Sequence, residues 1–141
     1  MKTNWILLSL MGVCLLGSFN SKEDACGDLL TKYAQKPKQL EFLSCKKGFG
    51  QVVLKARYRV KGKNAATVAK FLQQHYKMGK LKFVCCGWET GSVTFAKTIL
   101  QEDGSNRFYS VIMYSSETLI NKQVRWSDIP YFYVEAQIID V

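Results

Sequence analysis

The chain has 141 residues, a formal net charge of +9 at pH 7 and five cysteines. This length is enough for one domain with a substantial core and too short for two ordinary domains. A hydrophobic content of 48% with 22% charged residues excludes an intrinsically disordered chain.

The first twenty residues have the pattern of a secretory signal peptide. Lys2 is followed by an uncharged apolar run over residues 5–16 and then by small residues. This order is typical of such signals, and the run is too short to span a bilayer, which needs ~20 apolar residues. We therefore expect a signal peptide over residues 1–20, cleaved between 17 and 21. One exported domain over residues 21–141, without a transmembrane segment, would remain.

The expected domain begins with a helix and two strands. Residues 26–37 place leucines and a tyrosine at helical spacing and end at a proline, which commonly follows a helix. Residues 39–45 have the composition of a strand. Residues 51–60 alternate between apolar and mostly charged side chains, which indicates a strand with one face on a core.

The rest of the chain predicts one more helix and then strands. Residues 65–77 form an amphipathic pattern, with Asn64 as the expected N-cap and Gly79 as the expected end. The segments expected as strands are 81–86, 92–100, 107–115 and 131–141. Short connections favour antiparallel pairing. We therefore expect a single α+β domain, a twisted antiparallel sheet of five to six strands with two helices packed on one face.

The cysteines predict that this domain is braced by disulfides. Cys14 would leave with the signal peptide, and Cys26, Cys45, Cys85 and Cys86 remain, an even number in a small exported chain. Adjacent residues of a strand point to opposite faces, so we expect Cys85 and Cys86 to bond elsewhere rather than to each other. We favour Cys26–Cys86 with Cys45–Cys85, while the sequence leaves all three pairings open.

No catalytic or metal-binding motif is present. The single histidine, His75, lies on the expected second helix without an activated nucleophile. The double cysteine lacks the ligand spacing of a zinc site and the two intervening residues of a common redox pair. We expect no catalytic residue, no metal and no cofactor. Two alternatives stay open: a hydrolase that uses paired carboxylates, and a thiol-based redox protein.

Two groups of residues are candidates for a recognition surface. Lys55, Arg57 and Arg59 share one strand face, and Trp88 with Glu89 follows the double cysteine. A basic face attracts acidic proteins or cell-envelope components by electrostatic steering, and an exported location argues against nucleic acid. The alternatives are a solvated basic surface, a Trp88 that packs in the core and a Glu89 that pairs with a nearby lysine.

The stretches KPKQLEFLSC, ARYRVKGKNAATVAKFL and CCGWE resemble a family of small exported bacterial proteins, domain of unknown function 4952. The resemblance runs from Cys26 to the C-terminus. It implies a periplasmic or secreted protein of a Gram-negative bacterium and implies no activity.

The function expected from these patterns is that of a small exported binding protein. An inhibitor or immunity-type protein that recognises another macromolecule is one form of it. The alternatives are a cell-envelope hydrolase that uses carboxylates and a thiol-based redox protein.

Overall fold

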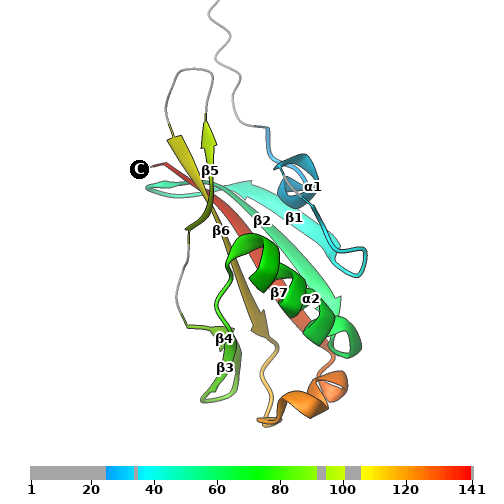
Figure 1. The fold of residues 1–141 in the computed structure, drawn as a ribbon. Coiled ribbons are helices and arrows are strands. Elements are labelled where there is room, and N and C mark those ends of the chain that lie inside the picture. Colours follow the sequence, from blue (N-terminus) through cyan, green and yellow to red (C-terminus); the bar gives the residue numbers. More distant parts are fainter. Residues whose placement is uncertain (1–24, 34, 92–94, 101–105, 141) are drawn as a thin grey trace, which may run out of the picture.

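The structure, a computed structural model (Figure 1), describes residues 25–33, 35–91, 95–100 and 106–140. The expected signal peptide lies outside these residues. The elements in chain order are α1 (Leu29–Tyr33), β1 (Glu41–Lys47), β2 (Val52–Lys61), α2 (Gly62–Tyr76), β3 (Leu81–Val84), β4 (Gly87–Thr90), β5 (Phe95–Leu100), β6 (Asn106–Ser115), the 3-10 helix η1 (Gln123–Asp128) and β7 (Tyr131–Asp140).

Seven strands form one antiparallel sheet, and the expected α+β architecture is confirmed. Six of them follow the order β1-β2-β7-β6-β4-β3, and β5 also pairs with β6. β5 and β4 share one edge of β6, because β5 pairs with residues 106–110 and β4 pairs at Tyr114. The long strands β2, β7 and β6 therefore form the centre of the sheet, and the shorter strands lie on either side of them.

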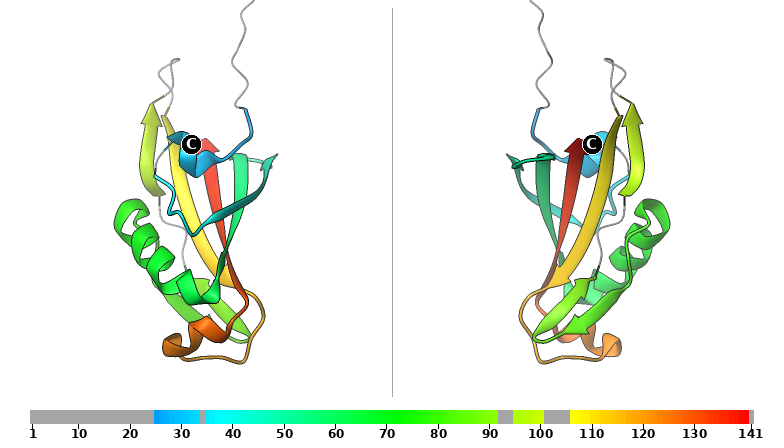
Figure 2. Two further views of the ribbon diagram at one scale, coloured as in Figure 1. Left: turned by 90° about the vertical axis from the view of Figure 1, so that its right-hand side faces the viewer. Right: turned by 90° about the vertical axis from the view of Figure 1, so that its left-hand side faces the viewer.

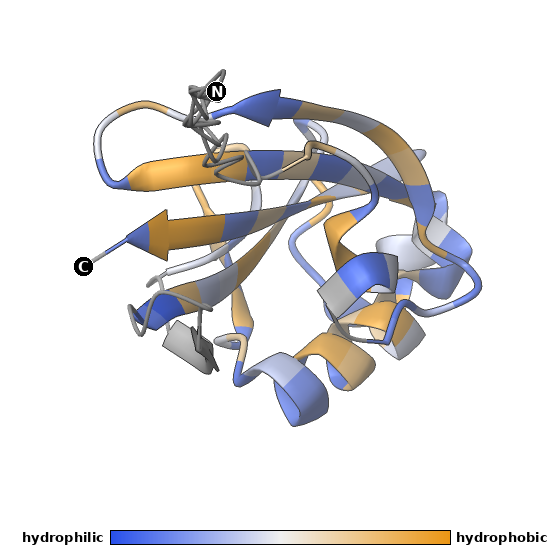
Figure 3. Ribbon diagram, turned by 90° about the horizontal axis from the view of Figure 1, so that it is seen from above, coloured by the Kyte–Doolittle hydropathy of each residue, from blue (hydrophilic) through white to orange (hydrophobic). Residues whose placement is uncertain are grey.

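The alternating pattern of residues 51–60 produces strand β2 as expected. Leu54, Ala56 and Tyr58 are buried on one face, whereas Arg57 is exposed on the other. β7 continues the pattern, with Val134 buried opposite Tyr58. Figure 3 shows the same alternation as successive hydrophilic and hydrophobic bands along the strands. One face of the sheet therefore builds the core, and the other stays open.

The two expected helices pack on the core face of the sheet (Figure 2). α2 buries Val68 and Leu72 along its inner stripe, and α1 buries Leu29 and Leu30 completely. The two helical segments are also tied together, because the Tyr76 hydroxyl at the end of α2 donates a hydrogen bond of 2.7 Å to the Gln35 carbonyl. Within the described ranges, no helix is both long enough and apolar enough to cross a membrane.

Helix α2 begins and ends earlier than the sequence predicted. It starts at Gly62, directly after β2, and Asn64 is therefore inside the helix rather than at its N-cap. A β-carbon at Gly62 would overlap the carbonyl oxygens of Trp126 and Ile129, so the close approach of η1 requires glycine there. At the other end, Lys77 adopts the left-handed conformation and closes the helix before Gly79.

The strand that we expected over residues 81–86 ends at Val84 and forms a hairpin with β4, so the prediction is wrong for Cys85 and Cys86. β3 ends at Val84, the two cysteines occupy the turn, and β4 begins at Gly87. Cys85 has a φ of 53°, in the left-handed region that non-glycine residues seldom adopt. Neither of the two turn positions carries a glycine, proline or asparagine, and the nearest such residue is Gly87, which begins β4.

The disulfides are Cys26–Cys45 and Cys85–Cys86, so the pairing that we favoured is wrong. The first joins the segment before α1 to β1, across Cα atoms 5.5 Å apart. The second lies within the β3–β4 turn. Our argument against it assumed a strand, in which adjacent side chains diverge, and the turn removes that restriction. The expectation of a disulfide-braced domain is confirmed.

Candidate functional site

The basic stripe predicted on β2 lies on the open face of the sheet, and its three cations already have partners. Lys55 Nζ lies 3.1 Å from Glu135 on β7. Arg59 makes two hydrogen bonds to Glu41 on β1, of 2.7 and 3.0 Å. The Arg57 guanidinium lies 4.6 Å from the ring centroid of Tyr133, a cation–π distance. The structure therefore brings these residues onto one face but engages each of them.

The partners also alter the acid–base properties of this face. The hydrogen bond from Arg59 holds the pKa of Glu41 below its ordinary value. Burial, together with the negative charge of Glu135, raises the pKa of Tyr114, whose ring stacks on Tyr133 at 5.7 Å. The open face is thus a layer of arginines, tyrosines and carboxylates in which much of the positive charge is internally balanced.

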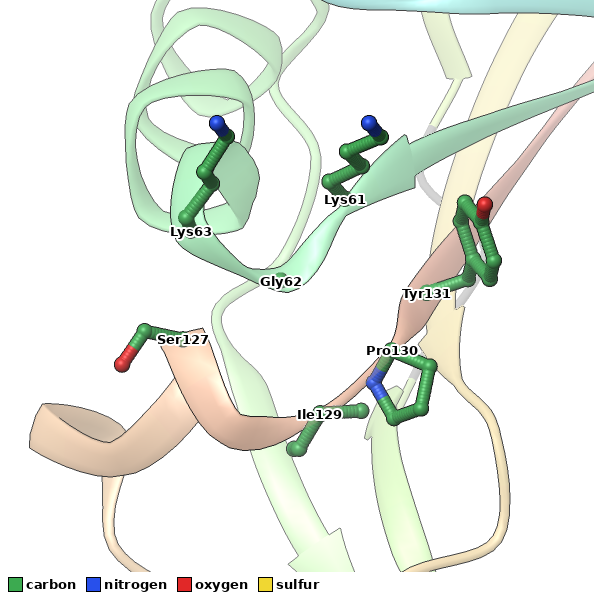
Figure 4. Close-up of a pocket in the computed structure, with 7 residues that line it drawn as sticks. All are labelled: Lys61, Gly62, Lys63, Ser127, Ile129, Pro130 and Tyr131. Carbon is green, nitrogen blue, oxygen red and sulfur yellow. The ribbon is translucent and has the colours of Figure 1, made fainter.

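More exposed positive charge lies where β2 passes into α2, with Glu41 the nearby carboxylate that Lys61 influences. Lys61 and Lys63 are exposed on either side of Gly62, and no carboxylate of the described residues lies within 4.0 Å of either amine. In Figure 4 the two side chains extend in the same direction beside a hollow of about 330 Å³. We call Arg59, Lys61, Gly62, Lys63 and Tyr131 the cationic corner.

The backbone adds to the positive potential of the cationic corner. The first turn of α2 contains no acidic residue and no side-chain cap, although the Gly62 N–H donates a hydrogen bond of 3.3 Å to the Pro130 carbonyl. The backbone N–H groups of the first turn give the start of a helix a partial positive charge. A second hollow, of about 300 Å³, extends from the corner over Arg59 towards Gln39 and Asn64. The arrangement favours an anion over a cation or a neutral ligand.

The second predicted group, Trp88 with Glu89, does not form a surface site. Trp88 is only 9% exposed, and its indole N–H donates a hydrogen bond of 2.8 Å to the Ile120 carbonyl. Its ring lies 5.1 Å from that of Trp126. Trp88 is therefore a core residue, as our alternative interpretation held, and its place among the surface candidates is corrected. Glu89 is exposed and lies opposite Lys82 in the β3–β4 register.

The described side chains offer little catalytic chemistry. Cys26, Cys45, Cys85 and Cys86 are all bonded. His75 is exposed, stacks on the Phe71 ring at 4.0 Å and contacts the Phe71 carbonyl through Nδ1. Among the described residues, no cluster of three or more histidines, cysteines or carboxylates could hold a metal ion. The two hollows are lined by a single carboxylate, that of Glu41.

The sequence prediction missed Lys61 and Lys63 as site residues. The signal was present in the stretch KGKN, where two lysines flank a glycine. We placed the N-cap of the helix at Asn64, which left both lysines outside the predicted helix. With the start at Gly62, they stand at the positive end of α2.

Comparison with protein-family models matches residues 18–88 to a family described as a domain of unknown function, DUF4952. The match includes β1, β2, α2 and β3 and ends at Trp88 within β4, so it is shorter than the extent to the C-terminus that the resemblance implied. Comparisons with curated proteins and with solved structures found no match. The match covers half of the chain, and the protein belongs to the DUF4952 family.

Proposed function

We propose that this protein is a small exported binding protein that recognises an anionic partner through the cationic corner. The observation that carries the proposal is the pair Lys61 and Lys63 beside a hollow of about 330 Å³ at the start of α2, which has no side-chain cap. Complementary charge raises association rates and excludes wrong partners. The chemistry of the corner fits an acidic protein or an anionic component of the cell envelope.

Two features support a location outside the cytosol, in the periplasm or secreted. The first is the signal-peptide pattern of residues 1–20. The second is that all four cysteines of the described residues are paired, because disulfides persist mainly in oxidising compartments. A rigid, disulfide-braced domain of this size suits an inhibitor or immunity-type protein that presents a fixed surface to its target.

Binding accounts for the site better than carboxylate-dependent hydrolysis does. A hydrolase of that kind needs two carboxyl groups in one cleft, one of them with a raised pKa. Glu41 is the only carboxylate among the described residues that line the hollows at the cationic corner. Its pKa is lowered by the hydrogen bond from Arg59, which is the opposite of what a general acid requires.

Thiol exchange is a second candidate, and one observation favours it. Cys85 and Cys86 are both exposed in the β3–β4 turn, so an external dithiol has access to their bond and can reduce it while becoming a disulfide itself. This candidate predicts that limiting dithiothreitol followed by alkylation labels Cys85 and Cys86 in the folded protein while Cys26–Cys45 stays intact. Simultaneous labelling of Cys26, Cys45, Cys85 and Cys86 would rule out thiol exchange at the β3–β4 turn as the function.

The test of the main proposal is binding of the purified protein to immobilised polyaspartate at several salt concentrations. We expect salt-sensitive binding that the double variant Lys61→Glu/Lys63→Glu weakens about tenfold or more. The matched control is Lys70→Glu/Lys80→Glu, which changes net charge equally at exposed positions outside both hollows. Equal weakening by the two double variants would show that net charge, rather than the cationic corner, determines binding.

A further inference from the structure

Two stretches far apart in the sequence meet at one end of the molecule. One is the β3–β4 turn, and the other is residues 116–128, which comprise residues 116–122 and helix η1. Both views of Figure 2 place these three segments together at the lower end. The Thr118 N–H donates a hydrogen bond of 2.8 Å to the Cys86 carbonyl, and Trp88 holds the Ile120 carbonyl at 2.8 Å. We call these three segments the apolar tip.

The apolar tip exposes large aliphatic side chains. Leu119 is 90% exposed, Val124 is 87% exposed and Val84 is 52% exposed, next to the exposed Cys85–Cys86 bridge. Single exposed aliphatic residues are ordinary in soluble proteins. Here, however, three of the six large hydrophobic residues found exposed in the described chain gather at one end, and that clustering requires a reason.

These side chains are held outward by rigid neighbours. Leu119 lies between Thr118 and Ile120, which are both hydrogen-bonded to the β3–β4 hairpin. Val124 lies on η1 two residues before Trp126, which is 4% exposed and packs its ring against Trp88. These contacts fix the backbone on both sides of Leu119 and two residues after Val124, and both side chains are exposed. The exposed aliphatic side chains are therefore attached to backbone that hydrogen bonds and ring packing hold in place.

Positive charge lies on one side of the apolar tip, at the cationic corner. The tip itself contains two cations, Lys122 and Arg125, and two carboxylates, Glu117 and Asp128, and the corner adds Lys61 and Lys63. The Asp128 carboxylate is paired with Arg125 at 2.9 Å. The hollow of the cationic corner is lined by Ser127 and Ile129 as well as by the two lysines, so the corner and the tip are continuous.

We infer that this end of the protein docks on a lipid bilayer that contains anionic lipids. Leu119 and Val124 enter the boundary between headgroups and acyl chains, and the lysines of the cationic corner, with Lys122, bind lipid phosphates. Apolar insertion flanked by basic residues is the physical basis of binding at a membrane surface. This inference rests on the proposed function because both use the cationic corner as the anion-binding surface. It specifies that the anionic partner is a lipid.

A lipid surface fits the apolar tip better than a protein partner does. Energetically dominant residues of protein interfaces are enriched in tryptophan, tyrosine and arginine that fill pockets. The exposed large hydrophobic groups of the tip are aliphatic, Trp126 is buried, and Arg125 is paired with Asp128. A fluid apolar phase accepts aliphatic side chains without matched pockets.

The experiment is co-sedimentation of the full purified protein with two kinds of vesicle. One contains phosphatidylcholine alone, and the other contains phosphatidylcholine and phosphatidylglycerol in equal amounts. We expect binding to the anionic vesicles, and we expect Leu119→Ser/Val124→Ser to weaken it more than about tenfold. The control is Phe49→Ser, which removes a side chain that is 96% exposed in the β1–β2 turn and should leave vesicle binding unchanged.

Polyaspartate binding, measured in parallel, separates the two proposals. Leu119→Ser/Val124→Ser should keep full polyaspartate binding, because the cationic corner is intact. If the wild-type protein binds polyaspartate but not anionic vesicles, the lipid inference is overturned and the proposed function stands. If the double variant sediments with anionic vesicles as well as the wild type does, the inference is also overturned, because charge alone would explain the binding.

Discussion

Two regions of this protein contain one disulfide each, and the two bonds differ in how much they contribute to the stability of the fold. Cys26–Cys45 joins residues 19 positions apart and fixes the segment before α1 to strand β1. Cys85–Cys86 joins neighbours and closes no loop. Disulfide stabilisation depends mainly on the loop that the bond closes in the unfolded chain. The two regions therefore need different sources of stability, although both contain two cysteines.

The region around α1 supplements its disulfide with a polar network. Asp28 pairs with Lys36 and accepts hydrogen bonds from the Thr31 N–H and the Tyr58 hydroxyl, of 3.1 and 3.0 Å. The same Tyr58 oxygen accepts a hydrogen bond from the Leu30 N–H. Burial raises the pKa of Tyr58, so this hydroxyl stays protonated. A five-residue helix is thereby attached to the sheet by covalent and polar contacts.

The β3–β4 region relies on aromatic packing instead. Trp88 makes edge-on ring contacts with Phe83 at 5.8 Å and with Trp126 at 5.1 Å. Trp126 in turn lies 5.0 Å from the Phe132 ring on β7. This cluster connects the hairpin and η1 to the central sheet, and the apolar tip stands on it.

Trp88→Ala should have the largest effect on stability. Removing a buried tryptophan and leaving a cavity costs about 3–5 kcal/mol, and the Ile120 carbonyl would also lose its donor. Chemical denaturation measures the change in the free energy of unfolding. Trp88→Phe is the control, because it keeps much of the packing while it removes the indole N–H. A loss below about 1 kcal/mol for Trp88→Ala would contradict the aromatic cluster as the anchor of the hairpin.

Cys26→Ser/Cys45→Ser should follow, with a loss of about 3 kcal/mol, because the bond closes a loop of nearly twenty residues. The same denaturation measurement on oxidised protein tests it. Unfolding that matches the wild type would mean that Cys26–Cys45 adds no constraint to the unfolded chain.

Asp28→Asn should cost about 1–2 kcal/mol at neutral pH, because it removes the charge that binds Lys36. Burial acts to raise the pKa of Asp28, but the hydrogen bonds from Lys36, Thr31 and Tyr58 outweigh it, and the pKa lies below its ordinary value of 3.8.

The lowered pKa of Asp28 fixes the direction of the pH dependence. A carboxyl group with a lowered pKa in the folded state stabilises the protein fully above its ordinary pKa and loses this contribution as pH falls through the folded value. The difference in the free energy of unfolding between wild type and Asp28→Asn should therefore be constant above about pH 5 and shrink below pH 3.8. A difference that grows in acid would refute the network.

Cys85→Ser/Cys86→Ser should have the smallest effect, below about 0.5 kcal/mol, because both residues are exposed and the bond closes no loop. Chemical denaturation of this variant and of Cys26→Ser/Cys45→Ser under the same conditions compares the contributions of the two disulfides to the free energy of unfolding. A loss as large as that of the first pair would show that the turn depends on its disulfide and not on Trp88.

The sequence predicted the elements with a complete hydrophobic period. Residues 54–60 alternate strictly between apolar and charged side chains and lie in β2, and the inner stripe of α2 was recognised from Val68 and Leu72. The β3–β4 turn was missed because its left-handed position is occupied by Cys85, and no propensity marks a cysteine for that conformation. The wrong disulfide pairing followed from the same error, since it was argued from a strand that in fact ends at Val84, before the two cysteines.

The candidate site was predicted in part, for a related reason. Alternation placed Lys55, Arg57 and Arg59 on one face, but it cannot show that Glu41 and Glu135 come across from β1 and β7 to meet them. Lys61 and Lys63 depend on where α2 begins. That start is set by the approach of η1 to Gly62, a contact between segments more than sixty residues apart.

The contrast between the two regions is tested most directly by mapping the disulfides in the protein as it is isolated. Tryptic digestion without reduction, after thiols are blocked in acid, should give a peptide from residues 23–32 joined to one from residues 39–46, through Cys26 and Cys45. The peptide over residues 83–97 should be unlinked and lighter by two hydrogens, with Cys85 bonded to Cys86. A bond from this last peptide to either of the first two would contradict the account.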